Sequence, residues 1–68
     1  MFNYSKLLGR IKECGLNQEK LAAALDKDKS TISAKLNNQS YFTQKEIDEI
    51  CKILDIPNEA IVDYFFAK

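Results

Sequence analysis

Residues 18–37 constrain the fold more than any other stretch, because they have the pattern of two short helices joined by a tight turn. Apolar side chains recur at helical spacing in both halves, at Leu21, Ala22, Leu25, Ile32 and Leu36. The turn has only about three residues, so the second helix must cross the first at close range. Asp28 is a candidate N-cap for the second helix, which we expect to begin near Lys29.

Gly15 and Pro57 divide the rest of the chain into further helical segments. Glycine readily adopts the left-handed conformation that follows a helix, so Gly15 is expected to end a first helix over about residues 4–14. Asn17 then has the position of an N-cap for the second helix. Pro57 cannot continue a helix, and a fifth helix is expected to follow it.

The sharpest predicted boundary lies before the fourth helix. Thr43 and Glu46 have the spacing of a capping box, and Phe42 with Ile47 has the spacing of the matching hydrophobic staple. We therefore expect a helix that begins near Gln44. No long alternating run suggests a strand, so the sequence predicts an all-α bundle of about five helices.

A chain of 68 residues is expected to form a single domain, residues 1–68, around one small core. The residues predicted to be largely buried are Leu7, Leu8, Ile11, Leu21, Ala22, Leu25, Ile32, Leu36, Ile47, Ile50, Leu54, Ile61 and Phe65. Cys14 and Cys51 also fall at apolar helical positions, which favours inert, reduced thiols in the core.

Composition argues against several classes of protein. The chain has no histidine, no phosphate-binding glycine loop and no convergent set of ligands, so neither an enzyme nor a metal or cofactor site is expected. No run of about 18 apolar residues occurs, so we expect a cytoplasmic protein that does not enter a membrane.

Charge is unevenly distributed although the net charge is zero. Residues 1–45 carry eight cations and four carboxylates, whereas residues 46–68 carry two cations and six carboxylates. The predicted helix-turn-helix lies in the basic part, as nucleic-acid binding requires. The acidic part and the zero net charge favour a protein partner instead.

The chain resembles the small helix-turn-helix regulators of the lambdoid phage repressor and Cro (XRE-like) family. The resemblance rests on Leu16-Asn17-Gln18-Glu19, Leu21-Ala22, Leu25, Ser30, Ile32 and Asn37, and it extends over about residues 4–66. It implies a lambda-repressor-like fold with the helix-turn-helix at residues 17–37. Two positions depart from the family: Asp26 replaces the usual turn glycine, and Lys27 replaces an apolar residue that its methylene stem could mimic.

The resemblance also implies a DNA interface. Side chains at the start of the second motif helix reach base edges in this fold, which assigns base contacts to Lys29, Ser30, Thr31 and Ala34. The residues better placed for phosphates are Asn17, Gln18, Ser33, Lys35, Asn37 and Asn38. An ordinary solvated polar surface is the alternative interpretation of all these side chains.

Two functions remain open from the sequence. The first is a sequence-specific transcription regulator that occupies a palindromic operator in double-stranded DNA. Such a protein is expected to bind as a homodimer, because one helix reads only a few base pairs, and Tyr64 and Phe66 are candidate dimer contacts. The second is a protein-interaction module of the same fold that modulates another regulator.

Overall fold

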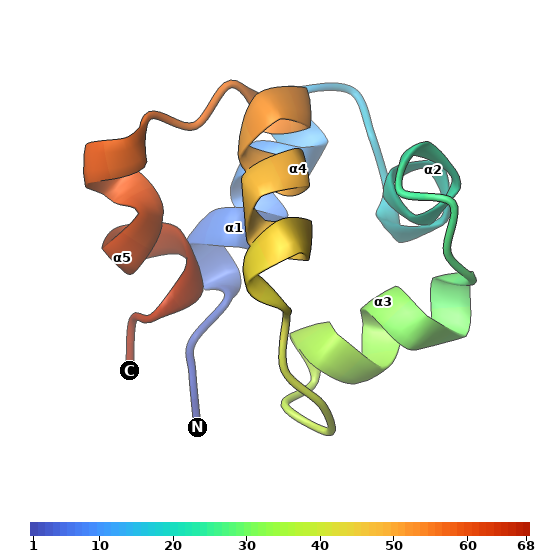
Figure 1. Ribbon diagram of the computed structural model, residues 1–68, viewed down its shortest axis with the longest axis horizontal. Helices are drawn as coiled ribbons and strands as arrows, with labels where there is room; N and C mark the ends of the chain where they lie inside the picture. Colours follow the sequence, from blue (N-terminus) through green and yellow to red (C-terminus); the bar gives the residue numbers. More distant parts are fainter.

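The structure, a computed structural model, describes residues 1–68 and consists of helices joined by short loops. In chain order the elements are α1 (Ser5–Glu13), α2 (Gln18–Ala24), α3 (Lys29–Leu36), α4 (Gln44–Leu54), the 3₁₀ helix η1 (Asn58–Ala60) and α5 (Ile61–Phe65). The predicted all-α architecture of five helices is confirmed. In Figure 1, α1 and α4 occupy the centre of the molecule, with α5 on one side and α2 and α3 on the other.

Side-chain caps explain where two of the helices begin. The Asn17 side chain accepts a hydrogen bond of 2.8 Å from the backbone N–H of Lys20, which fixes the start of α2. The predicted capping box is present at α4, where Thr43 and Glu46 each accept from the other's backbone N–H. Asp28 does occupy the N-cap position of α3, but its side chain makes no capping hydrogen bond.

Left-handed residues shape the turns on either side of α2. Gly15, with φ of +74°, follows α1 as predicted. Asp26 adopts φ of +58° in the turn between α2 and α3, so an aspartate occupies the conformation that glycine adopts most easily. The backbone N–H of Lys27 then closes the turn on the carbonyl of Ala22 at 2.8 Å. The side chain of Lys27 is exposed.

The core forms largely as predicted, with corrections at its edges. Its buried apolar members are Tyr4, Leu7, Ile11, Leu21, Ala22, Leu25, Ile32, Leu36, Ile50, Cys51, Leu54, Ile56 and Phe65. The predicted burial of Leu8 is wrong, because 41% of this residue is exposed. Ile47 and Ile61 are only half-buried against the core, and Cys14 is exposed rather than internal.

Candidate DNA and protein interaction surfaces

Helices α2 and α3 pack against each other as a helix-turn-helix unit. A shallow polar hollow lies between their N-terminal ends, and it is lined by Asn17, Gln18, Glu19, Lys29 and Ser33. Four of these five residues are among the predicted DNA contacts, so the fold does bring the two ends of the motif to one surface. The carboxylate of Glu19 on the same hollow reduces its positive charge.

The predicted base-contacting residues lie on the accessible side of α3. Lys29 and Ser30 are exposed, while Thr31 and Ala34 are half-buried. Asn37 is also exposed, and its amide donates to the Ser33 hydroxyl at 3.3 Å. This face has short polar side chains and a single lysine, Lys29, at its start.

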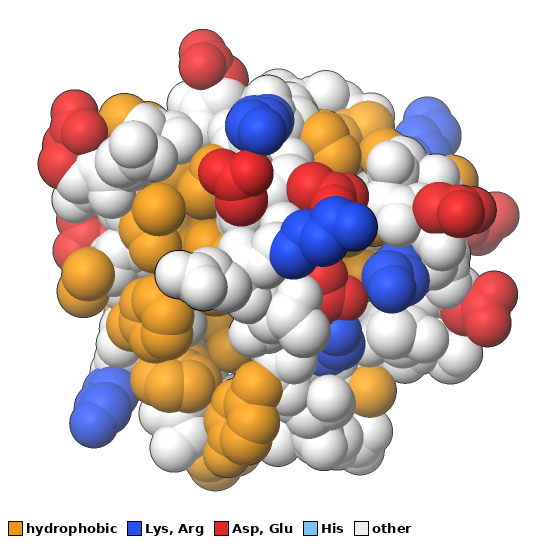
Figure 2. Space-filling model, viewed as in Figure 1, with side chains coloured by type: hydrophobic (Ala, Val, Ile, Leu, Met, Phe, Trp, Pro, Cys, Tyr) orange, Lys and Arg blue, Asp and Glu red, His pale blue; other side chains and the backbone are white.

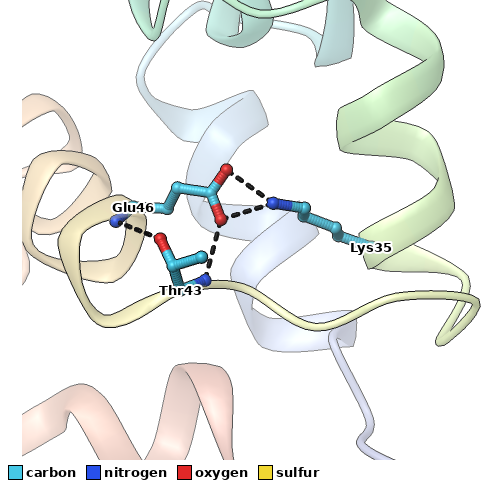
Figure 3. A network of polar contacts seen from close by, with 3 residues as sticks. All are labelled: Lys35, Thr43 and Glu46. Atoms are coloured by element: carbon cyan, nitrogen blue, oxygen red, sulfur yellow. Dashed lines mark hydrogen bonds and ion pairs between the residues drawn. The ribbon is translucent and has the colours of Figure 1, made fainter.

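Lys35 does not lie on this accessible face, contrary to the prediction. The residue is only 8% exposed, and its Nζ donates to both carboxylate oxygens of Glu46 on α4 (Figure 3). The ammonium group is therefore committed to an internal ion pair between α3 and α4. Lys35 is accordingly withdrawn from the set of phosphate contacts.

Glu46 has three polar contacts in a nearly buried position. Besides the ion pair with Lys35, its Oε1 accepts from the backbone N–H of Thr43, and its own N–H donates to the Thr43 hydroxyl (Figure 3). Burial raises the pKa of Glu46, but the hydrogen bonds from Lys35 and Thr43 and the charge of Lys35 outweigh that effect and hold the pKa below its ordinary value. The carboxylate is thus ionised at neutral pH, and each of its two oxygens accepts at least one hydrogen bond.

The Asn38 side chain was predicted to contact phosphate, but in the structure it is hydrogen-bonded to the backbone of Phe2. Its amide nitrogen donates to the carbonyl of Phe2 at 2.9 Å, and its amide oxygen accepts from the N–H of Phe2 at 2.8 Å. Asn38 itself has φ of +63°, in the left-handed region that asparagine tolerates. The side chain therefore fastens the N-terminal segment to the α3–α4 loop, and it is withdrawn from the proposed phosphate contacts.

A second surface, which we call the aromatic groove, lies beside the two chain ends. Its nine lining residues are Met1, Phe2, Tyr4, Tyr41, Phe42, Ile47, Phe65, Phe66 and Lys68. Figure 2 shows the corresponding concentration of hydrophobic side chains on the side of the molecule that carries α5 and the termini. Lys68 is the only lining residue that has a charged side chain.

The aromatic groove is built from three segments that are distant in the sequence. Phe2 packs against Tyr41 and Phe66 at ring-centroid distances of 6.2 and 5.6 Å, both edge to face. Beneath them Phe42 contacts the rings of Tyr4 and Phe65 in the same geometry. Tyr41 and Phe66 remain 70% and 44% exposed, which is unusual for such large apolar side chains.

The two candidate dimer residues have different positions. Phe66 lines the aromatic groove, whereas Tyr64 does not. Tyr64 is half-buried, and the ammonium of Lys6 lies 5.0 Å above its ring. Phe2 and Tyr41 were not predicted to form an interaction surface, although the aromatic residues near both ends of the sequence were a signal.

Other kinds of site have no support in the structure. No group of three or more Cys, Asp or Glu side chains is placed to hold a metal ion. No helix has the length and apolar character needed to span a membrane.

A solved structure of a known protein has a closely similar fold. It is the solution structure of the modulator of repression (MOR) of the temperate bacteriophage TP901-1 from Lactococcus lactis, with a TM-score of 0.83 and 34% sequence identity. The match covers 96% of this chain and 88% of that one. No curated protein sequence matches the chain.

The sequence also matches one family model from its first residue to its last. That model is described as "Protein of unknown function (DUF739)", and the match spans residues 1–68. The chain therefore belongs to the family described as protein of unknown function, DUF739.

Proposed function

We propose that this chain modulates repression in a phage genetic switch by binding a repressor protein. The observation that carries the proposal is the similarity to the modulator of repression, which has 34% identity and extends over nearly the whole of both chains. The match covers 96% of this chain and 88% of that one, so no large segment distinguishes the two proteins.

The aromatic groove supports a protein partner. Phe2, Tyr41 and Phe66 offer large, rigid apolar surfaces around a concave centre, and such side chains dominate the energetics of protein interfaces. A monomer gains nothing from leaving them in water, since each would contribute more if it were covered. Phosphate groups would find one lysine there and no polar cradle.

The helix-turn-helix surface also favours a protein partner over DNA, because it has little positive charge. Lys29 is exposed on α3, but the other lysine of that helix, Lys35, is neutralised by Glu46. Glu19 also lines the hollow in which Lys29 lies. Non-specific DNA affinity depends on cations that face phosphates, so this face is poorly equipped to bind DNA on its own.

A reporter assay tests the proposal directly. The chain is expressed together with a repressor from the same phage or prophage genome and a reporter gene under that repressor's operator. We expect reporter activity to change with the chain only when the repressor is present. A direct binding measurement with the two purified proteins should give the same ranking of variants.

Matched variants identify the surface that acts. Tyr41→Ala and Phe66→Ala should weaken binding to the repressor by at least about tenfold, as expected for aromatic residues central to an interface. Val62→Ala is the control, because Val62 is 64% exposed on α5 but does not line the aromatic groove. Equal effects of all three variants, or an effect of the chain on the reporter without any repressor, would contradict the proposal.

Sequence-specific DNA binding is the second candidate function. It is favoured by the common polar hollow that joins Gln18, Lys29 and Ser33. If the chain binds DNA in this way, the base contacts are Lys29, Ser30, Thr31 and Ala34. The phosphate contacts are Asn17, Gln18, Ser33 and Asn37. The candidate homodimer contacts are Tyr64 and Phe66. A single lysine-to-guanine contact is worth about 1–3 kcal/mol of discrimination, so Lys29→Ala should change which operator is preferred.

A titration against operator DNA at two salt concentrations separates the two candidates. Specific retention of the operator by the chain alone, which weakens as salt is raised, would favour the second candidate. Retention that requires the repressor would favour the first.

A further inference from the structure

We propose that Glu46 is a specificity-determining residue, which withholds the Lys35 cation from DNA and so biases the helix-turn-helix unit toward a protein partner. The inference goes beyond the proposed function, because it concerns the affinity of this chain for duplex DNA of any sequence. It holds or fails independently of whether a repressor is the partner.

The position of Lys35 on α3 is the first step. Lys35 belongs to the buried side of α3 with Ile32 and Leu36, and Thr31, one turn before Lys35, lies at the edge of that side. Thr31 is half-exposed at the flank of the accessible face. A Lys35 side chain that extended along this flank would add a second cation to a face that now has only Lys29.

The ion pair prevents that extension. Both carboxylate oxygens of Glu46 accept from the Lys35 Nζ, and the two side chains are only 8% and 11% exposed. Glu46 cannot easily follow Lys35 outward, because the Thr43 capping box holds it at the first turn of α4. The carboxylate is the fixed partner, and the lysine is the flexible one.

An open path to solvent is also available to Lys35. A hollow between α4 and the turn that precedes α3 is lined by Lys35 and Glu46. Its other lining residues are Leu25, Asp26, Lys27, Thr43, Lys45 and Glu49, so the cations Lys27 and Lys45 there are balanced by the carboxylates of Asp26 and Glu49. A neutral partner no longer attracts the ammonium by charge, so we expect the lysine to move from the interior toward the water of this hollow. Glu46→Gln should trigger this movement with little damage to the fold, because glutamine also satisfies a capping box.

The test measures binding of the purified chain to a short duplex of mixed sequence over a range of salt concentrations. We expect Glu46→Gln to make the slope of log affinity against log salt steeper by about one unit, as one added phosphate contact requires. The same slope corresponds to a gain in affinity on the order of tenfold at about 50 mM salt.

Asp48→Asn is the matched control for charge. It makes the same change of one unit in net charge and also frees a lysine of α4, Lys52, but this pair is on the surface and does not line the hollow. We expect its slope to stay close to that of the unmodified chain. Equal slopes for Glu46→Gln and Asp48→Asn, or no detectable DNA binding by either, would overturn the proposal.

The double variant Lys35→Gln/Glu46→Gln keeps the proposal testable even if Glu46→Gln alone does not fold. It removes both charges, leaves the net charge unchanged and retains polar side chains of similar size. If Lys35 is withheld from DNA in the unmodified chain, the double variant should bind DNA with the same affinity and slope. A slope shallower by about one unit would show that Lys35 already contacts phosphate, and the proposal would be wrong.

Discussion

Replacement of Lys35 by methionine should destabilise the fold far more than the loss of an ordinary salt bridge. The change removes the partner of a carboxylate that is only 8% exposed and cannot move away. Breaking a buried ion pair by deleting one member costs about 3–5 kcal/mol. The Thr43 N–H still donates to Glu46, so we expect a value near the lower end, about 3 kcal/mol.

A surface ion pair within α4, between Lys52 and Asp48, provides the control. Lys52 lies 3.1 Å from Asp48 at the i, i+4 spacing, with side chains 76% and 64% exposed. Such pairs contribute about 0.3–0.5 kcal/mol, so Lys52→Met should have almost no effect. Glu46→Gln should fall between the two, at about 1 kcal/mol, because the flexible Lys35 side chain can move toward the hollow that it lines, whereas the Thr43 capping box holds Glu46 in place.

Urea unfolding followed by circular dichroism measures these differences. With a slope of about 1 kcal/mol per molar urea for so small a domain, Lys35→Met should lower the midpoint by about 3 M and Lys52→Met by less than about 0.5 M. Similar midpoints for the two lysine variants would refute the reasoning, because the internal pair would then be no more important than an exposed one.

The pH dependence of stability provides an independent check on the same pair. Because the native pKa of Glu46 is lowered from its ordinary value of 4.5, its contribution is fully present above pH 4.5 and is lost as the pH falls through the lower native value. Lys35→Met removes the hydrogen bond and the charge of Lys35, which lower this pKa, and leaves only the hydrogen bonds from Thr43 against the effect of burial. The difference in free energy of unfolding between the two proteins should therefore shrink as the pH falls below about 4.5.

Three further predictions concern the core, a turn and the thiols. Leu21→Ala should cost about 3–5 kcal/mol in unfolding free energy because Leu21 is fully buried, whereas Leu8→Ala should cost about 1 kcal/mol or less; equal costs would contradict the difference in burial between the two residues. Asp26→Gly should raise the unfolding free energy by up to about 1 kcal/mol, since glycine adopts φ of +58° without strain; a loss of stability would count against this. A water-soluble thiol reagent should label exposed Cys14 and spare Cys51, where burial raises the pKa of the thiol, and labelling in the reverse order would contradict the structure.

The backbone architecture could be predicted from the sequence because its signals are local. Caps at Asn17 and Thr43 and the left-handed position at Gly15 depend on residues within a few positions of one another. These signals located the helices without any knowledge of tertiary contacts. The error at Leu8 has a related cause, since helical spacing shows that residues share a face but not how far a neighbouring helix covers it.

The interaction surfaces were harder to predict because they depend on contacts between distant residues. The burial of Lys35 depends on a carboxylate eleven positions away in the next helix. The contact of Asn38 with Phe2 spans 36 positions and has no sequence pattern of its own. A lysine and an asparagine in a helix-turn-helix are therefore assigned to DNA by default, and only the packed structure shows their other partners.

The composition of the aromatic groove has a consequence for the order of folding. Its parts come from both ends of the chain and from the α3–α4 loop, and they are joined by the Phe2–Asn38 hydrogen bonds and by one from Asn3 N–H to the carbonyl of Ala67. Closing such long loops carries a high entropic cost, whereas the pairing of α2 with α3 requires only a short turn. The helix-turn-helix should thus be structured in the folding transition state, and the groove should assemble after it. Substitutions in the groove should then accelerate unfolding and leave the folding rate nearly unchanged.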